Sequence, residues 1–80
     1  MNEPGPSRVR FSRHAVVRAA QVGRAPTDVA DLVLDGHPRR RRNPREADWL
    51  VSAAGLVVAY NWPDGDDPTT ARVVTLWPQE

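Results

Sequence analysis

The sequence FSRHAVVR, residues 11–18, continues to Gly23 and has the pattern of a strand end that passes directly into a helix. Ser12 is a suitable N-cap, because its hydroxyl can accept a hydrogen bond from a free amide of the first helical turn. Gly23 suits the left-handed conformation in which many helices end. We therefore expect a short strand over residues 8–11 and a helix over residues 13–22.

The two faces of this helix differ in character. Apolar residues at i, i+3 and i+4 form the face that we expect to pack inward: Val16, Ala19 and Ala20. His14, Arg18 and Gln21 follow one another at i, i+4 and i+7 and form a polar stripe. A histidine and an arginine near a helix N-terminus suit an anionic ligand, because the free amides and the helix dipole favour negative charge. The stripe is therefore the first candidate site.

The length and composition of the chain limit the alternatives. Its 80 residues are enough for one domain, which we expect over residues 8–80, after a mobile N-terminal tail over residues 1–7. The absence of cysteine excludes a disulfide and a thiolate metal site. Neither a secretory signal nor an apolar run of ~20 residues is visible, so we expect a cytoplasmic protein that does not cross a membrane.

Positive charge is concentrated in the first half of the chain. Residues 7–45 contain ten arginines and three aspartates, a net charge of +7, whereas residues 46–80 carry a net charge of −5. The sequence HPRRRRNPR, residues 37–45, is typical of a loop, because its prolines block regular pairing. Within it, an extension of residues 39–42 into the start of a strand is also consistent with the pattern. A solvated surface loop and a patch that binds nucleic acid or an acidic partner are both consistent with its four consecutive arginines. These are Arg39, Arg40, Arg41 and Arg42.

Patterns in the rest of the chain complete the expected fold. Thr27 is a good N-cap for a second helix that ends at Gly36. Its apolar stripe consists of Val29, Leu32 and Val33. Alternating apolar residues predict strands over residues 48–53, 56–62 and 70–77, with a hairpin turn at Ala54-Gly55.

The predicted fold class is α+β, with the element order β-α-α-β-β-β. We expect an antiparallel sheet with the N-terminal helical hairpin packed on one face. In the last strand, strict alternation places Val74 and Leu76 on one face. It places three residues on the other face: Val73, Thr75 and Trp77.

Histidines and carboxylates do not form a metal-binding pattern in this sequence. His14 and His37 are the only histidines, and no helix presents paired ligands at metal spacing. The acidic cluster at residues 64–67 lacks the downstream glutamate that a calcium loop requires. No Gly-rich phosphate loop is present. We therefore expect neither a metal nor another cofactor.

His14 and the last strand together suggest chemistry on RNA. A base, arginines, a hydroxyl donor and an aromatic platform are the groups that metal-free RNA cleavage uses. His14 is the candidate base, because the start of a helix disfavours its protonated form. Thr75 and Trp77 would supply the hydroxyl and the platform, although ordinary strand packing explains the same pair. Tyr60 suits a stacking role and a core position equally well.

The chain resembles a small family of domains related to RelE/BrnT toxins and to the barnase–EndoU–colicin–RelE group of ribonucleases. The resemblance rests on the FSRHAVVR block, on a helix that ends at Gly36 and on a meander that ends in VVTLW, residues 73–77. It spans most of residues 8–77. It implies a metal-independent ribonuclease fold, often that of a toxin held by a cognate antitoxin or immunity protein.

The resemblance also implies roles for individual residues. His14 matches a histidine of colicin D-like tRNA nucleases, and Thr75 and Trp77 match a hydroxyl and an aromatic residue two apart on a late strand. The basic partner is one of three residues: Arg10, Arg13 or Arg18. RelE-like enzymes rely on a cluster of cations and often on a tyrosine, to which three residues correspond: Arg18, Arg42 and Tyr60.

Two hypotheses follow. The first is a toxin-like ribonuclease that cleaves tRNA or mRNA through attack of a 2′-hydroxyl, with His14, Arg18 and Thr75 as catalytic residues. Its RNA-binding residues would be Arg10, Arg13, Arg39, Arg40, Arg41, Arg42, Tyr60 and Trp77. The alternative is a non-catalytic module that binds RNA or an acidic protein through the basic helix and the Arg39–Arg42 loop.

Overall fold

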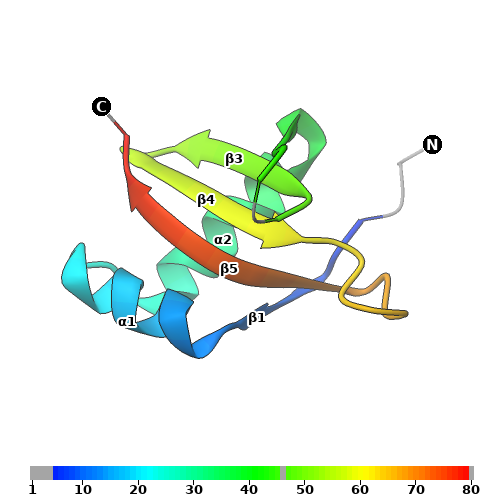
Figure 1. Cartoon of the computed structure of the whole chain (residues 1–80), viewed down its shortest axis with the longest axis horizontal. Helices are drawn as coiled ribbons and strands as arrows, with labels where there is room; N and C mark the ends of the chain where they lie inside the picture. The colour runs from blue at the N-terminus through cyan, green and yellow to red at the C-terminus, as the bar shows by residue number, and fades with distance from the viewer. Residues whose placement is uncertain (1–4, 46, 80) are drawn as a thin grey trace.

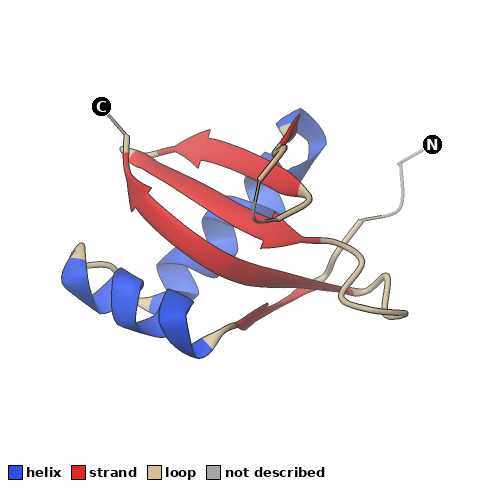
Figure 2. Ribbon diagram, viewed as in Figure 1, coloured by secondary structure: helices blue, strands red, loops and turns tan. Residues whose placement is uncertain are grey.

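A computed structural model describes residues 5–45 and 47–79 of the chain (Figures 1 and 2). The described elements are β1 (Arg8–Phe11), α1 (Arg13–Gln21), α2 (Pro26–Gly36), the 3-10 helix η1 (His37–Arg39), β2 (Arg41–Arg42), β3 (Trp49–Ala53), β4 (Leu56–Asn61) and β5 (Thr70–Pro78). The predicted class, α+β, is confirmed. The segment predicted as a loop begins with a turn of 3-10 helix, which was not expected, and continues into the two-residue strand β2, which agrees with the alternative of a strand start there.

The five strands form one sheet in the order β1-β5-β4-β3-β2. β3, β4 and β5 form the expected antiparallel meander, and β2 adds to it beside β3. β1 joins the same sheet but runs parallel to β5, with Arg8 opposite Thr70 and Phe11 opposite Val73. The prediction of a wholly antiparallel sheet is therefore wrong. The two helices between β1 and the meander provide the crossover that a parallel pair requires.

The two helices occupy different places against the sheet (Figure 1). α2 crosses one face and packs on β1 and β3. α1 lies beside β5 instead, along the part of its edge that β1 does not reach. The expected helical hairpin on one face is thus only half correct, because α1 borders the sheet rather than covering it.

Side chains from α1 bind the open edge of β5. The Ser12 hydroxyl donates to the carbonyl of Val74 at 2.9 Å and accepts from the amide of Ala15 at 3.0 Å. Arg18 Nε donates to the carbonyl of Leu76 at 3.2 Å. The predicted N-cap is therefore confirmed, and the same hydroxyl also fastens the helix to the strand. These hydrogen bonds satisfy backbone carbonyls of β5 that would otherwise need donors from a neighbouring strand.

The buried face of α1 is not the face that the sequence predicts. Ala15 and Ala19 are the buried residues of the helix, whereas Val16 is 46% exposed. Small side chains on the buried face allow the helix to approach β5 closely, and the larger valine lies on the outside. Gly23 ends the helix with φ +73°, as expected.

α2 begins and ends differently from the prediction. Ala25 is the N-cap and Pro26 the first helical residue, in place of Thr27. Gly36 lies within the helix rather than in a left-handed stop, and the chain continues into η1. A Cβ on Gly36 would lie 2.3 Å from Cγ1 of Val51, so glycine is required here by the contact between α2 and β3.

An irregularity in β5 determines which of its side chains face the core. Ala59 pairs with Thr75, but the next residue, Tyr60, pairs with Val73, so Val74 is an extra residue in β5. Val73 before this bulge is buried in the core, and Leu76 after it is buried as well. The prediction that Val73 shares a face with Thr75 is therefore wrong.

The N-terminal end is partly held against the sheet. The amides of Ser7 and Arg8 both donate to the carbonyl of Thr69, at 2.8 and 3.0 Å. Residues 1–4 of the predicted mobile tail lie outside the described residues. Most of the buried apolar side chains of the described residues form one cluster, to which α1, α2 and the inner face of the sheet contribute.

Candidate functional site

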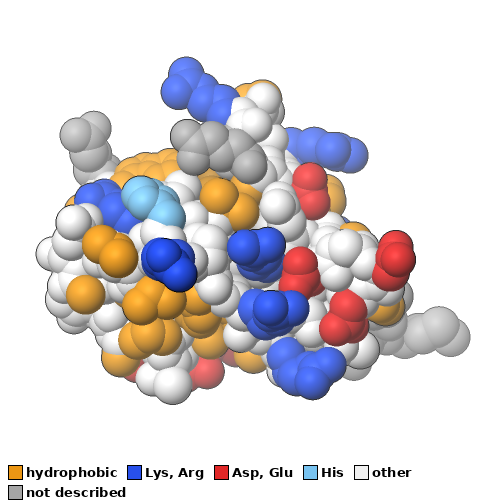
Figure 3. Space-filling view, turned by 60° about the horizontal axis from the view of Figure 1, so that its bottom comes forward, with side chains coloured by type: hydrophobic (Ala, Val, Ile, Leu, Met, Phe, Trp, Pro, Cys, Tyr) orange, Lys and Arg blue, Asp and Glu red, His pale blue; other side chains and the backbone are white. Residues whose placement is uncertain are grey.

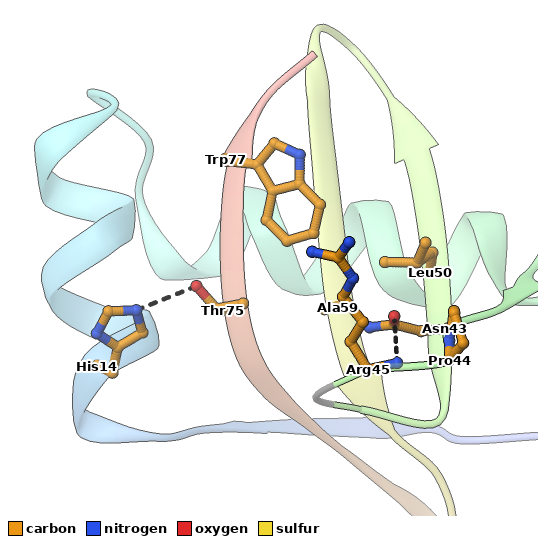
Figure 4. A pocket seen from close by; sticks show the side chains of 8 residues that line it. All are labelled: His14, Asn43, Pro44, Arg45, Leu50, Ala59, Thr75 and Trp77. Carbon is orange, nitrogen blue, oxygen red and sulfur yellow. Dashed lines mark hydrogen bonds between the residues drawn. The ribbon is translucent and has the colours of Figure 1, made fainter.

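A hollow of about 520 Å³ lies on the face of the sheet opposite α2 (Figure 4). Its wall comes from α1, from the loop after β2 and from the three central strands. The lining residues are His14, Asn43, Pro44, Arg45, Leu50, Ala59, Thr75 and Trp77. Three of the predicted site residues, His14, Thr75 and Trp77, are therefore brought together.

His14 and Thr75 are in direct contact at one end of the hollow. His14 Nε2 lies 3.1 Å from Thr75 Oγ1, a hydrogen bond that joins α1 to β5 (Figure 4). The imidazole belongs to an exposed residue of the first turn of α1, which Ser12 anchors to β5. Thr75 is only 8% exposed, so the hydrogen bond links an exposed imidazole to a largely buried hydroxyl.

Trp77 forms the upper part of the hollow in the view of Figure 4. The bulge at Val74 shifts the alternation of β5 by one residue, so that Thr75 and Trp77 both point away from the core. The Trp77 ring is 38% exposed and extends over β4. An indole with one open side can stack on a planar ligand such as a nucleobase.

Of the five lining residues that the sequence did not indicate, two are polar, Asn43 and Arg45. The side-chain oxygen of Asn43 accepts from the amide of Arg45 at 3.1 Å, and the Asn43 amide donates to the carbonyl of Asp48 at 3.0 Å. This turn directs Arg45 over the outer face of β4, towards the ring of Trp77 (Figure 4). The Asn43-Pro44 pair is a turn signal, but nothing in the local pattern shows that the turn folds back over the sheet.

Arg18 does not take the predicted place in the site. Its guanidinium donates to the carbonyl of Leu76 and, at 2.9 Å, to Oε1 of Gln21, and it does not line the hollow. The spacing that put His14 and Arg18 on one face was correct. That face meets the edge of β5, where an arginine satisfies backbone groups instead of a ligand.

Tyr60 is a core residue, so its predicted role in stacking on RNA is wrong. The side chain is 0% exposed, and its hydroxyl shares a 2.7 Å hydrogen bond with Nδ1 of His37. Burial raises the pKa of Tyr60 to about 12, and the positive charge of Arg40 opposes this shift. The imidazole of His37 also meets the ring of Trp62 edge-on, with ring centroids 4.5 Å apart.

The four arginines at residues 39–42 are engaged within the protein. The guanidinium of Arg40 lies over Trp49, 4.4 Å from the ring centroid, and Arg42 lies 5.1 Å from the same ring. Arg41 donates to the hydroxyl of Ser52 and Arg39 to the carbonyl of Asp35. None of the four lines the hollow. Their predicted role in binding RNA is therefore not supported by their position at the site.

Neither Arg10 nor Arg13 lines the hollow. Arg13 is an exposed residue at the start of α1, next to His14. Arg10 belongs to β1 and forms an ion pair with Asp64 at 3.6 Å.

The described residues offer neither a metal site nor a membrane-spanning helix. Within residues 5–45 and 47–79, no three histidine or acidic side chains come together in a way that could hold a metal ion. No helix in the same residues has the length and apolar character needed to cross a membrane.

The hollow combines the groups needed for a proton transfer next to a phosphate. An imidazole can accept a proton, a hydroxyl can donate to a phosphoryl oxygen, a guanidinium can bind the charge and an indole can hold a base. Comparisons of the chain with protein-family models, with curated proteins and with solved structures find no match. The function proposed next therefore depends on the geometry of the hollow.

Proposed function

We propose that this protein is a metal-independent endoribonuclease of the toxin type, similar in design to RelE-like and colicin-like enzymes. The observation that carries the proposal is the 3.1 Å contact between His14 Nε2 and Thr75 Oγ1 in a hollow that also contains Trp77 and Arg45. Residue type and spacing alone predict three of these four residues, His14, Thr75 and Trp77. Arg45 replaces Arg18 as the proposed phosphate ligand, because Arg18 is occupied at the edge of β5.

The proposed reaction is an internal attack within RNA. His14 takes the proton of a ribose 2′-hydroxyl, and the 2′-oxygen forms a bond to the adjacent phosphorus. The bond from phosphorus to the 5′-oxygen of the next nucleotide breaks, and that oxygen takes a proton from water. The products are a 2′,3′-cyclic phosphate and a free 5′-hydroxyl.

The other residues of the hollow would bind the RNA and stabilise the negative charge that develops on its phosphate. Arg45 would form charge-assisted hydrogen bonds with the phosphate, and the Thr75 hydroxyl would donate to a phosphoryl oxygen as negative charge develops there. Trp77 would stack on the base next to the cleaved bond and so fix the attacking geometry. An enzyme of this type would act in the cytoplasm and would need a neutralising antitoxin or immunity protein, which we include in the proposal.

The test is cleavage of purified tRNA and of ribosome-bound mRNA by the purified protein, at neutral pH and in the presence of EDTA. We expect His14→Ala to lower the cleavage rate by about 10²–10⁴-fold, the usual contribution of a general base. Thr75→Val keeps the shape of the side chain and removes the hydroxyl, so it should also lower the rate. Val17→Ala is the matched control, because Val17 is an exposed residue of the same helix outside the hollow.

Two results would contradict this proposal. A folded native protein that cleaves neither substrate is not a ribonuclease for them, and if it still binds RNA it is the non-catalytic module of the second hypothesis. Cleavage that is the same in the native protein and in His14→Ala would come from another residue or from a contaminating enzyme.

A further inference from the structure

Three arginines lie on the outer side of the molecule next to the hollow: Arg10, Arg13 and Arg72. We call them the basic row. Arg10 and Arg72 face away from the core, because their neighbours Val9 and Val73 pack inward. Figure 3 shows one side of the molecule, where arginine side chains follow one another from the exposed histidine and carboxylates lie beside part of this line.

The sheet places two of these charges in direct opposition. Arg10 of β1 is the Cα partner of Arg72 of β5, so two guanidinium groups occupy facing positions on the same side of neighbouring strands. Like charges at directly opposite positions destabilise a sheet. This pairing lowers the stability of the free protein, and the carboxylate of Asp64, 3.6 Å from the guanidinium of Arg10, offsets only part of that cost.

Arg13 is also at an unfavourable position. It is the first residue of α1, and the first turn of this helix contains no acidic residue. The positive end of the helix dipole disfavours a cation and favours an anion at this place. An anion bound here would therefore interact favourably with both the positive end of the helix dipole and the guanidinium of Arg13.

Within residues 5–45 and 47–79, one carboxylate forms an ion pair with the basic row. Asp64 pairs with Arg10 at 3.6 Å. Among the described residues, neither Arg13 nor Arg72 forms an ion pair or a side-chain hydrogen bond. The basic row therefore keeps most of its positive charge available to a ligand.

The position of the row relative to the hollow indicates the size of this ligand. Arg13 adjoins His14 in sequence, and Arg72 precedes Thr75 by three residues of β5. Three residues of extended strand span about 10 Å, which is the rise of roughly three stacked nucleotides. An RNA strand with one phosphate in the hollow would thus bring a later or an earlier phosphate to the basic row.

We propose that the basic row binds backbone phosphates of single-stranded RNA that continues out of the hollow, so that the substrate is an oligonucleotide rather than a dinucleotide. The inference rests on the proposed function, because it takes the hollow as the place of the reacting phosphate. A single strand fits better than a duplex, since a base must leave its stack to lie on Trp77.

The experiment measures RNA binding without cleavage, by fluorescence anisotropy of the His14→Ala protein in EDTA over a range of salt concentrations. The probes are a single-stranded octanucleotide, the same octanucleotide in a duplex and a dinucleotide. We expect the single-stranded octanucleotide to bind most tightly. Adding Arg72→Gln or Arg10→Gln should weaken its binding and lower the salt dependence, log K against log salt, by about 0.7 for each lost phosphate contact.

Arg39→Gln provides the matched control. It removes the same charge from an exposed arginine of η1 that lies outside both the hollow and the basic row. Equal losses for Arg39→Gln and Arg72→Gln would mean that only net charge matters, and would overturn the proposal. Equal affinity for the dinucleotide and the octanucleotide would overturn it as well.

Two further outcomes separate this inference from the proposed function. If the native protein does not cleave RNA but binding still depends on Arg10 and Arg72, the basic row is supported and the proposed reaction fails. If cleavage proceeds and the arginine variants bind and cleave octanucleotides normally, the reaction stands and the basic row is overturned. Binding of polyglutamate, but not RNA, with the same dependence on Arg72 would identify an acidic protein as the ligand instead.

Discussion

The buried tyrosine leads to a quantitative prediction about alkaline pH. Burial raises the pKa of Tyr60 to about 12 from the usual 10.0, against the opposing charge of Arg40. The hydroxyl lies in the core and shares its hydrogen bond with His37. The folded protein therefore holds the phenolic proton more tightly than the unfolded chain does.

The sign and size of the effect follow from this difference in pKa. Between pH 10 and pH 12 the unfolded chain loses the proton while the folded protein keeps it, so the free energy of unfolding falls as the pH rises. The stabilisation is complete below pH 10, and a shift of about two pKa units corresponds to about 3 kcal/mol lost by pH 12. Because the chain has one tyrosine and neither lysine nor cysteine, Tyr60 is the one side chain that titrates in this range.

The assay is urea unfolding, followed by circular dichroism at a series of pH values up to pH 12, for the native protein and for Tyr60→Phe. We expect the native protein to lose about 3 kcal/mol across this range. The variant should begin about 1–2 kcal/mol less stable, because its hydrogen bond to His37 is lost, and should then change little with pH. Phenolate absorbance that appears near pH 10 while the protein remains folded would refute the core position of Tyr60.

Three further changes test the fold. Ser12→Ala removes the N-cap and the bond to β5, and should lower the free energy of unfolding by about 1–3 kcal/mol, measured by urea unfolding. Gly36→Ala places a methyl group against Val51 and should cost about 1–3 kcal/mol in the same assay, whereas a stability equal to that of the native protein would contradict the close contact. The hydroxyl and amide of Thr69 bind Asp67 and, with other contacts, hold its pKa below the usual 3.8. Stability should therefore fall as the pH falls through that value, and Asp67→Asn should reduce this acid dependence.

Local patterns were sufficient to predict most of the elements. Period-two alternation located β3, β4 and β5, and Ala54 and Gly55 form their hairpin turn with φ of 51° and 80°. Ser12 and Gly23 marked the limits of α1, because capping depends on residues close in sequence. The parallel pairing of β1 with β5 could not be read in this way, since it depends on where two helices return the chain.

In the site as well, residues placed by local pattern were predicted, and residues placed by contacts distant in sequence were not. His14, Thr75 and Trp77 were identified from residue type and spacing, and the structure brings them together. Its spacing of one helical turn from His14 predicts Arg18 as a site residue. In the structure, its guanidinium instead donates to the carbonyl of Leu76 at the open edge of β5. Arg45 was missed, because only the folded loop brings it over the sheet.

The bulge at Val74 could not be predicted from the alternation of apolar and polar residues. Val73 and Val74 are both valine, so the sequence does not show which of them faces the core. Alternation predicted a common face for Thr75 and Trp77 correctly, since both follow the bulge. It misplaced Val73, which precedes the bulge and packs in the core. The run of arginines was ambiguous for a different reason, since stacking on tryptophans distant in sequence decides the environment of Arg40 and Arg42.

The placement of α1 along β5 has a consequence for the behaviour of the protein in a crowded solution. A strand edge with unpaired carbonyls is a template on which another polypeptide can add, and such addition begins many aggregates. Here the carbonyls of Val74 and Leu76 are occupied by Ser12 and Arg18. A helix in this position blocks the addition of another strand to β5 without extending the sheet. The face of the sheet that carries the hollow stays open to solvent.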